Sequence, residues 1–190
     1  VTLESSNTSY LTVQATVTVP AGSTSAWFRV DGVAPRTLGA PTITASASGW
    51  TSGSRALSVL APEIRMYSMT YSRTTLTAPQ AVSSYVLCGG SYCGNTVAPI
   101  AVSYAVTSDL PLGLVAFTNA TASIAADGYI SDSAGVIGTP TAGGTYKITP
   151  SAAGLTSVES SVVTVALPSI TVTCYYCNNV GAGMYLPASY

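Results

Sequence analysis

The chain has 190 residues, of which 47% are hydrophobic and only 7% are charged, and its formal net charge is −1. Ordinary soluble domains carry roughly 25% charged residues, and so small a net charge excludes the basic footprint of a nucleic-acid-binding protein. The chain has no histidine, so it cannot build a Ser-His-Asp or Cys-His catalytic site. No apolar run approaches the ~20 residues of a membrane-spanning helix. We therefore expect no enzyme activity, cofactor, nucleic-acid partner or membrane span.

Apolar residues alternate with Ser and Thr along most of the chain, and Gly, Pro, Ser and Asn separate the alternating runs. This period of two predicts β-strands, and no stretch keeps a helical spacing. The first set of strands is predicted near Tyr10–Val19, Ser25–Val30, Thr42–Ser48, Ala56–Val59, Ile64–Tyr71 and Thr75–Thr77. The second set is predicted near Ser83–Cys88, Ala98–Thr107, Leu114–Asn119, Ser123–Ala125, Gly144–Pro150 and Val158–Cys174. The pattern predicts an all-β fold of two immunoglobulin-like β-sandwich domains.

The N-terminal strand has the most regular alternation in the chain. Its apolar side chains share one face and follow Tyr10; they are Leu11, Val13, Ala15, Val17 and Val19. Such a strand buries one face and exposes the other. Two interpretations are open: the strand folds back onto its own sheet, or it projects and completes the sandwich of another subunit by β-strand addition. Pro20 ends the strand, and the flexible sequence after it favours the second interpretation.

The chain divides, on this interpretation, into a donor strand and tail (1–20), a first domain (21–80) and a second domain (81–190). The segment Thr77–Ser83 has the composition of a junction. The second domain contains Gly143–Thr149, with the sequence GGTYKIT, ahead of a Val-rich strand. This run resembles the closing strands of bacterial and archaeal surface Ig-like repeats.

The four cysteines fall into two close pairs, Cys88 with Cys93 and Cys174 with Cys177. An even number of cysteines in a surface-type β protein indicates disulfides. Local bridges within each pair are one arrangement, since two glycines permit a tight turn inside the first pair. Cross-pairing of the two segments is the rival, because positions i and i+3 of a strand face opposite ways. A zinc site of four cysteines is a third, less favoured alternative, and we expect no metal.

Two sequons, beginning at Asn7 and Asn119, predict N-linked glycans. Seven acids and no histidine leave few groups to titrate, so a hydroxyl-rich surface keeps its protonation state in acid. The chain begins at Val1, as it would after removal of a secretory leader. These features together predict an extracellular location.

The alternating strand Tyr10–Val19, the two Ig-like units and the low charge together resemble the archaeal thread filament subunits. The resemblance implies a cell-surface filament of identical glycosylated subunits, outside a thermoacidophilic archaeon, in which each subunit donates a strand to the next. It also implies a structural role in surface adhesion or biofilm. The alternative from another class is a monomeric Ig-like adhesin or S-layer module that binds carbohydrate or another cell surface.

Overall fold

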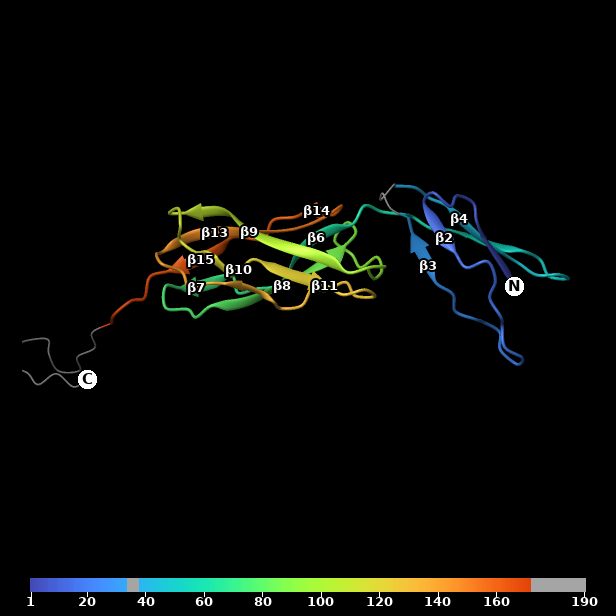
Figure 1. The fold of residues 1–190 in the computed structure, drawn as a ribbon, viewed down its shortest axis with the longest axis horizontal. Helices are drawn as coiled ribbons and strands as arrows, with labels where there is room; N and C mark the ends of the chain where they lie inside the picture. The colour runs from blue at the N-terminus through green and yellow to red at the C-terminus, as the bar shows by residue number, and fades with distance from the viewer. Residues whose placement is uncertain (34–37, 172–190) are drawn as a thin grey trace, which may run out of the picture.

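The computed structural model of the chain describes residues 1–33 and 38–171. Every regular element in these residues is a β-strand, which confirms the predicted all-β fold. The strands form two parts along the long axis of the molecule (Figure 1). We call β1–β5 the N-terminal lobe and β6–β15 the sandwich.

The N-terminal lobe consists of two small antiparallel sheets. The larger has the order β1 (Thr2–Ser5), β4 (Thr42–Ser46), β5 (Gly53–Ala56), and the smaller pairs β2 (Leu11–Val13) with β3 (Val30–Gly32). The only large apolar side chains that the described part of the lobe buries are Leu3, Leu11 and Ile43. The lobe is therefore thin and has a small core.

The sandwich consists of two five-stranded sheets. In order across the first sheet are β10 (Phe117–Asn119), β12 (Gly135–Ile137), β8 (Gln80–Leu87), β6 (Glu63–Ser68) and β14 (Thr156–Ser157). In order across the second are β11 (Thr121–Ile124), β9 (Ile100–Leu110), β13 (Gly144–Ala152), β15 (Val163–Ala166) and β7 (Ser72–Thr74). Most neighbours are antiparallel; β14 with β6 and β7 with β15 are parallel.

The core of the sandwich lies between its two sheets and follows from the alternation of its strands. In β13, for example, Tyr146 and Ile148 point inward and are at most 1% exposed. Thr145, directly before Tyr146, points outward and is exposed. From the facing sheet, Ile64 in β6 and Val82 in β8 contribute buried side chains to the same core. The first residue of this core cluster is Ile64, so the N-terminal lobe contributes nothing to it among the described residues.

Several strand predictions differ from the structure. The predicted strand Tyr10–Val19 is reduced to β2, because the chain leaves β3 after Val13 and turns toward β1. Ser25–Val30 becomes a strand only at Val30, since the residues before it have no neighbouring strand. The prediction of a strand at Thr75–Thr77 is wrong. These residues belong to a turn, in which Thr77 N donates a hydrogen bond to Thr74 O at 3.0 Å.

The structure also shifts the predicted strands around the ends of the two parts. Ala56–Val59 lies mostly beyond β5, and only Val59 pairs again, in a bridge with Gly39. Within Val158–Cys174, the strand β15 covers only Val163–Ala166, and the end of that prediction lies outside the described residues.

The predicted boundary between residues 80 and 81 falls inside the sandwich. Strand β6, before this boundary, pairs with β8 from Glu63–Leu87 to Ser68–Ser83. Strand β7, also before it, pairs with β15 near the end of the described chain. The segment Thr77–Ser83 therefore connects two strands of one sandwich, and the chain passes between the two parts at residues 57–62 instead.

Candidate functional site: the N-terminal segment and its lobe

The segment expected to act as a donor strand lies against its own lobe in the structure. Val13 pairs with Val30 in β3, whereas Ala15 accepts a hydrogen bond from Leu3 N in β1 at 2.8 Å. The amino group of Val1 donates to Val17 O at 3.0 Å, and Val17 N donates to Val1 O at 2.9 Å. The segment thus bridges the two small sheets.

Its apolar face is only partly buried. Leu11 is 4% exposed, Val13 and Val17 are half-buried, and Ala15 is exposed. Val19, the last apolar position, is 38% exposed. The alternation in the sequence would allow all five side chains to face a core, so its own lobe covers less of this face than the sequence provides for.

Tyr10 fixes the start of this segment. Its ring lies over Gly39, where a Cβ would come within 3.0 Å of three ring atoms. Gly39 in turn forms the bridge with Val59, on the connection that leads to the sandwich. Tyr10 therefore joins the donor segment to the base of its lobe.

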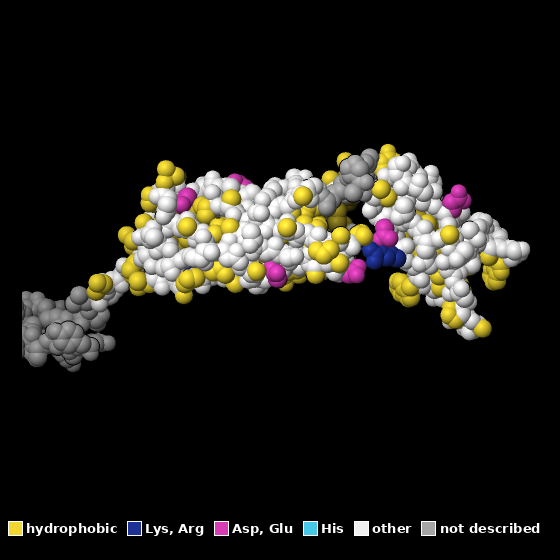
Figure 2. All heavy atoms as spheres, in the orientation of Figure 1, with side chains coloured by type: hydrophobic (Ala, Val, Ile, Leu, Met, Phe, Trp, Pro, Cys, Tyr) yellow, Lys and Arg dark blue, Asp and Glu magenta, His cyan; other side chains and the backbone are white. Residues whose placement is uncertain are grey.

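The N-terminal lobe carries the largest exposed aromatic side chains of the described residues. Trp27 is 98% exposed and Trp50 is 81% exposed, and Phe28 beside Trp27 is 39% exposed. Strand β5, an edge of the larger sheet, is exposed at every position. Figure 2 shows hydrophobic groups on the surface of the lobe and few charged ones. Large exposed apolar groups are typical of interaction surfaces.

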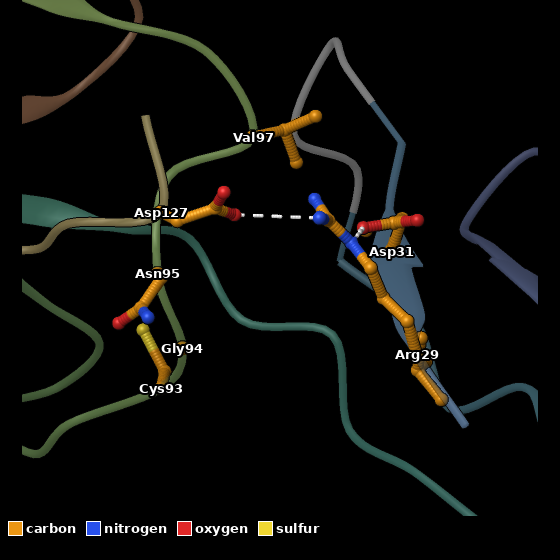
Figure 3. Close-up of a pocket in the computed structure, with 9 residues that line it drawn as sticks. Arg29, Asp31, Cys93, Gly94, Asn95, Val97 and Asp127 are labelled. Carbon is orange, nitrogen blue, oxygen red and sulfur yellow. Dashed lines mark hydrogen bonds and ion pairs between the residues drawn. The ribbon is translucent and has the colours of Figure 1, made fainter. Parts of the chain in front are cut away.

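An ion pair links the lobe to the sandwich (Figure 3). Arg29 lies just before β3; its Nε is 2.6 Å from Asp31 Oδ1, and its Nη1 is 3.3 Å from Asp127 Oδ1. Asp127 belongs to the turn that precedes Gly128, and its φ of 58° is left-handed. The hydrogen bond that Arg29 donates to the Asp31 carboxylate is the main reason why the pKa of Arg29 lies above its ordinary value. Because all three side chains are exposed, the pair positions the lobe only weakly.

An apolar cleft of about 880 Å³ lies next to this ion pair, between the lobe and the sandwich. Leu11 and Val30 line it from the lobe, Leu60 from the connection, and Val97 and Ile100 from the sandwich. Thus one side of the donor segment, at Leu11, forms part of the wall of the cleft.

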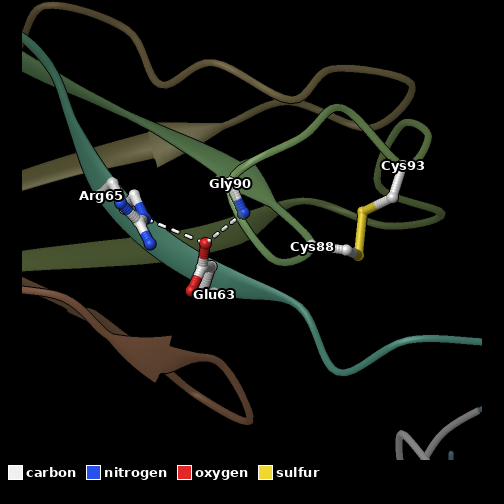
Figure 4. The surroundings of a disulfide bond; sticks show 5 residues. All are labelled: Glu63, Arg65, Cys88, Gly90 and Cys93. Carbon is white, nitrogen blue, oxygen red and sulfur yellow. Dashed lines mark hydrogen bonds and ion pairs between the residues drawn. A yellow bond between two sulfur atoms is a disulfide. The ribbon is translucent and has the colours of Figure 1, made fainter.

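The disulfide Cys88–Cys93 closes a short loop at the end of the sandwich nearest the lobe (Figure 4), with a Cα–Cα distance of 5.7 Å. This confirms the local bridge for the first cysteine pair. Glu63 Oε1 accepts hydrogen bonds from Gly90 N in this loop at 2.8 Å and from Arg65 Nε at 2.9 Å. Arg65, and then the Gly90 amide, lower the pKa of Glu63. Cys174 and Cys177 lie outside the described residues.

The two sequon asparagines differ in how their side chains are engaged. Asn7 is exposed, and its Oδ1 accepts from Ser9 N at 2.9 Å. Asn119 is also exposed, but its Nδ2 donates to Ala134 O at 2.6 Å while Thr121 Oγ1 donates to its Oδ1. Both asparagines are thus on the surface.

At the other end of the sandwich, a buried arginine holds the edge strand β7 in place. Arg73 is 2% exposed, and its guanidinium donates to Tyr146 Oη at 3.1 Å and to the carbonyls of Ala78 and Gly138 at 3.0 Å each. Its Nε is buried without a partner. The bonds connect β7 to β13 and to the chain after β12.

Sequence reasoning missed Arg29, Asp127 and Arg73. The ion pair joins residues 98 positions apart, and neither residue stands in a motif. Arg73 stands between Ser72 and Thr74, and a single arginine in a polar run gives no sign that its side chain is buried. No group of three His, Cys, Asp or Glu residues comes together in the described ranges.

Comparisons with known proteins show remote similarity only. No protein-family model matches the chain, and no curated protein matches it. Similar solved structures include a family 2 glycosyl hydrolase from Bacteroides cellulosilyticus, with 12% identity and a TM-score of 0.42 over 73% of this chain and 19% of that chain. A β-glycosidase from Bacteroides vulgatus has 12% identity and a TM-score of 0.40 over 82% of this chain and 21% of that one.

The chain therefore spans about a fifth of the length of these two enzymes. Similarity at this level has no bearing on what the chain does. Separately, the structure holds no helix within residues 1–33 and 38–171 that could traverse a bilayer.

Proposed function

We propose that the chain is the structural subunit of an extracellular filament, in which an N-terminal strand donated by one copy joins it to the next. The observation that carries the proposal is the mismatch between the donor segment and its own lobe. Five apolar side chains alternate on one face from Leu11 to Val19, yet only Leu11 is fully buried in the isolated chain. Covering the others against a second copy would stabilise the junction by about 1–2 kcal/mol for each large side chain.

The fold supports this proposal in a second way. The edge strand β7 runs parallel to the last strand β15, while β6, its predecessor, pairs with β8 in the opposite sheet. A first strand that divides between the two sheets is typical of an immunoglobulin-like sandwich, which supports the predicted Ig-like class. Addition of a strand to the edge of a sheet uses main-chain hydrogen bonds for affinity and side-chain pockets for specificity.

The thinness of the N-terminal lobe also favours assembly. Its two sheets have five strands of five residues or fewer, and its exposed apolar groups include both tryptophans of the chain. Small antiparallel sheets need a covered face to be stable in water. A second copy would supply that cover, and the donor segment and its acceptor are different surfaces, so the contact can propagate.

The extracellular location is part of the proposal. The Cys88–Cys93 disulfide and the scarcity of charge support it, because disulfides persist mainly in oxidising compartments. Surface adhesion or biofilm is the role that such a filament would serve, with glycans at Asn7 and Asn119.

Deleting residues 1–20 tests the proposal. The sandwich core begins at Ile64, so we expect the truncated protein to keep a folded sandwich, visible as a cooperative transition in thermal unfolding. It should lose the ability to polymerise, measured by sedimentation and by electron microscopy beside the intact chain. Filaments formed by the truncated protein would contradict the proposal. A monomeric intact chain would instead favour the adhesin alternative.

A further inference from the structure

We infer that the exchanged segment Val1–Val19 completes the N-terminal lobe of the second copy, and not its sandwich. The inference rests on the proposed function and names the acceptor of the donated strand. The segment would take, in the neighbouring copy, the place that it occupies in its own chain. Each subunit would then be completed by the one before it.

The sandwich offers no vacant strand position among the described residues. Both sheets have five strands, and fifteen buried side chains fill the space between them. The edge strand β7, which a donated strand would have to displace beside β15, is held by three hydrogen bonds from Arg73. The N-terminal lobe is therefore the better acceptor.

The lobe already shows how the segment fits. Strand β1 pairs with β4 at four positions, from Thr2–Ser46 to Ser5–Ile43, and β2 pairs with β3 at three. Leu3 and Leu11 of the segment are buried there. Because all copies have the same sequence, the lobe of a second copy presents the same strands and the same pocket. Exchange of an identical element between copies is domain swapping.

The connection that would cross between copies is the exposed loop Pro20–Phe28. Its residues are all described, and its one internal backbone hydrogen bond joins Ser23 N to Pro20 O at 3.0 Å. Figure 1 shows the connection between β2 and β3 as a long loop that extends away from the lobe. Fully extended, nine residues can span about 30 Å.

The same loop carries the most exposed tryptophan. Trp27 is 98% exposed, and Phe28 beside it and Val19 at the start of the loop are 39% and 38% exposed. In the closed monomer these side chains face water without a partner surface. Along a connection that runs between two copies, both copies would cover them. The backbone ladder of the segment is the same in both states, so exchange is favoured by the cover that two adjoining lobes would give to these loop side chains and to the half-buried Val13 and Val17.

The rest of the lobe stays with its own sandwich because residues 57–62 join β5 directly to β6, and two contacts after the loop add to this connection. Arg29 pairs with Asp127 at the end of the loop, and Gly39 bridges to Val59 on the connection to β6. Strands β3, β4 and β5 thus stay with their sandwich, while β1 and β2 lie before the loop and are free to exchange. Each copy would give its segment to one neighbour and receive the segment of another neighbour. Contacts of this head-to-tail kind can continue into a filament.

A cysteine pair across the β2–β3 ladder tests the exchange in the full chain. Val13 and Val30 lie opposite each other in the register, and both are partly exposed. Val33 N donates to Tyr10 O, so by alternation the Val13–Val30 pair is not hydrogen-bonded, which brings the side chains close enough for a disulfide. The variant Val13→Cys/Val30→Cys is assembled into filaments, oxidised, and run on a denaturing non-reducing gel.

Three variants serve as controls. The single substitutions Val13→Cys and Val30→Cys show whether an introduced cysteine forms a disulfide with a native cysteine. Ser103→Cys/Ser151→Cys joins two exposed facing positions within the sandwich and should give a monomer band from the same filaments.

A ladder of covalent multimers from Val13→Cys/Val30→Cys, absent from all three controls, is the expected result. A monomer band from intact filaments would overturn the exchange and leave a strand-joined filament standing. A covalent dimer that never extends would overturn the open-ended arrangement. A protein that forms no filaments and runs as a monomer would contradict both the exchange and the proposed function.

Discussion

The ring of Tyr10 lies directly against Gly39, and a side chain at position 39 would fit only if the ring moved. A Cβ at position 39 would approach the Cδ1, Cδ2 and Cε1 atoms of the ring to 3.0 Å each. Through this contact, the first residue of the donor segment rests on the base of the N-terminal lobe. The same contact would form in a second copy if the segment were exchanged.

Gly39→Val should therefore weaken the seating of Tyr10. Overpacking of this kind typically costs about 1–3 kcal/mol, and we expect slower or weaker assembly, measured by light scattering at several protein concentrations. Gly53→Val is the matched control, since nothing lies within 4 Å of a Cβ at that position of the same lobe. Equal effects of the two substitutions would show that the Tyr10 contact has no role in assembly.

Arg73 should be essential for the stability of the sandwich. Tyr146→Phe removes one of its three hydrogen bonds and leaves a buried donor unpaired, which costs about 1–3 kcal/mol of unfolding free energy. Arg73→Met removes all three bonds and should cost more. Denaturant unfolding measures both variants, with Arg55→Met on the exposed strand β5 as the control. An Arg73→Met variant as stable as the control would contradict the role assigned to Arg73.

Glu63 should make the sandwich less stable in acid. Hydrogen bonds from Arg65 and Gly90 lower the pKa of this carboxylate in the folded chain below its ordinary value of 4.5. Its contribution is then fully present above about pH 4.5 and is lost as the pH falls through the folded pKa. We expect the urea midpoint of the unmodified protein to fall between pH 5 and 2, and Glu63→Gln should flatten that fall.

The matched control for Glu63 is Glu4→Gln, because Glu4 is an exposed glutamate on β1. It should leave the pH dependence of unfolding close to that of the unmodified chain. If Glu63→Gln and Glu4→Gln gave the same pH profile, the loop contact of Glu63 would not contribute to acid sensitivity.

The two faces of the donor segment should respond differently to charge. Val13→Asp/Val17→Asp places carboxylates on the half-buried apolar face and should abolish polymerisation. Thr12→Asp/Thr16→Asp adds the same charge to the exposed face of the same segment and should leave polymers largely intact. Sedimentation separates polymer from subunit in both variants. Loss of polymer in the threonine variant alone would reverse the assignment of the faces.

The sequence predicts the class of fold well because period-two alternation is a local property. Strands with an apolar face against the sandwich core, such as Gly144–Pro150, appear almost where expected, as β13. The alternation between Leu11 and Val19 is equally clear, yet only Leu11–Val13 forms a regular strand in the isolated chain. Alternation predicts which face of a strand is apolar, but it does not predict which other segment covers that face.

The division into parts and the long-range contacts could not be predicted in the same way. Strand β7 lies beside β15, 92 positions later in the register at Ser72–Thr164, and no local pattern encodes that pairing. The sequence does predict the Cys88–Cys93 bridge as one of its disulfide arrangements, because two glycines allow the turn between them. The pairing of Arg29 with Asp127 depends on how the lobe meets the sandwich, and therefore had no signature in either segment.

Negative-stain electron microscopy of the intact protein tests the central claim most directly, combined with limited proteolysis of the same sample. The account predicts uniform thin filaments in which residues 1–20 resist protease, because each segment lies in the lobe of a neighbouring copy. Monodisperse single molecules, with residues 1–20 protected from protease, would contradict it, because the segment would then be complete within its own chain.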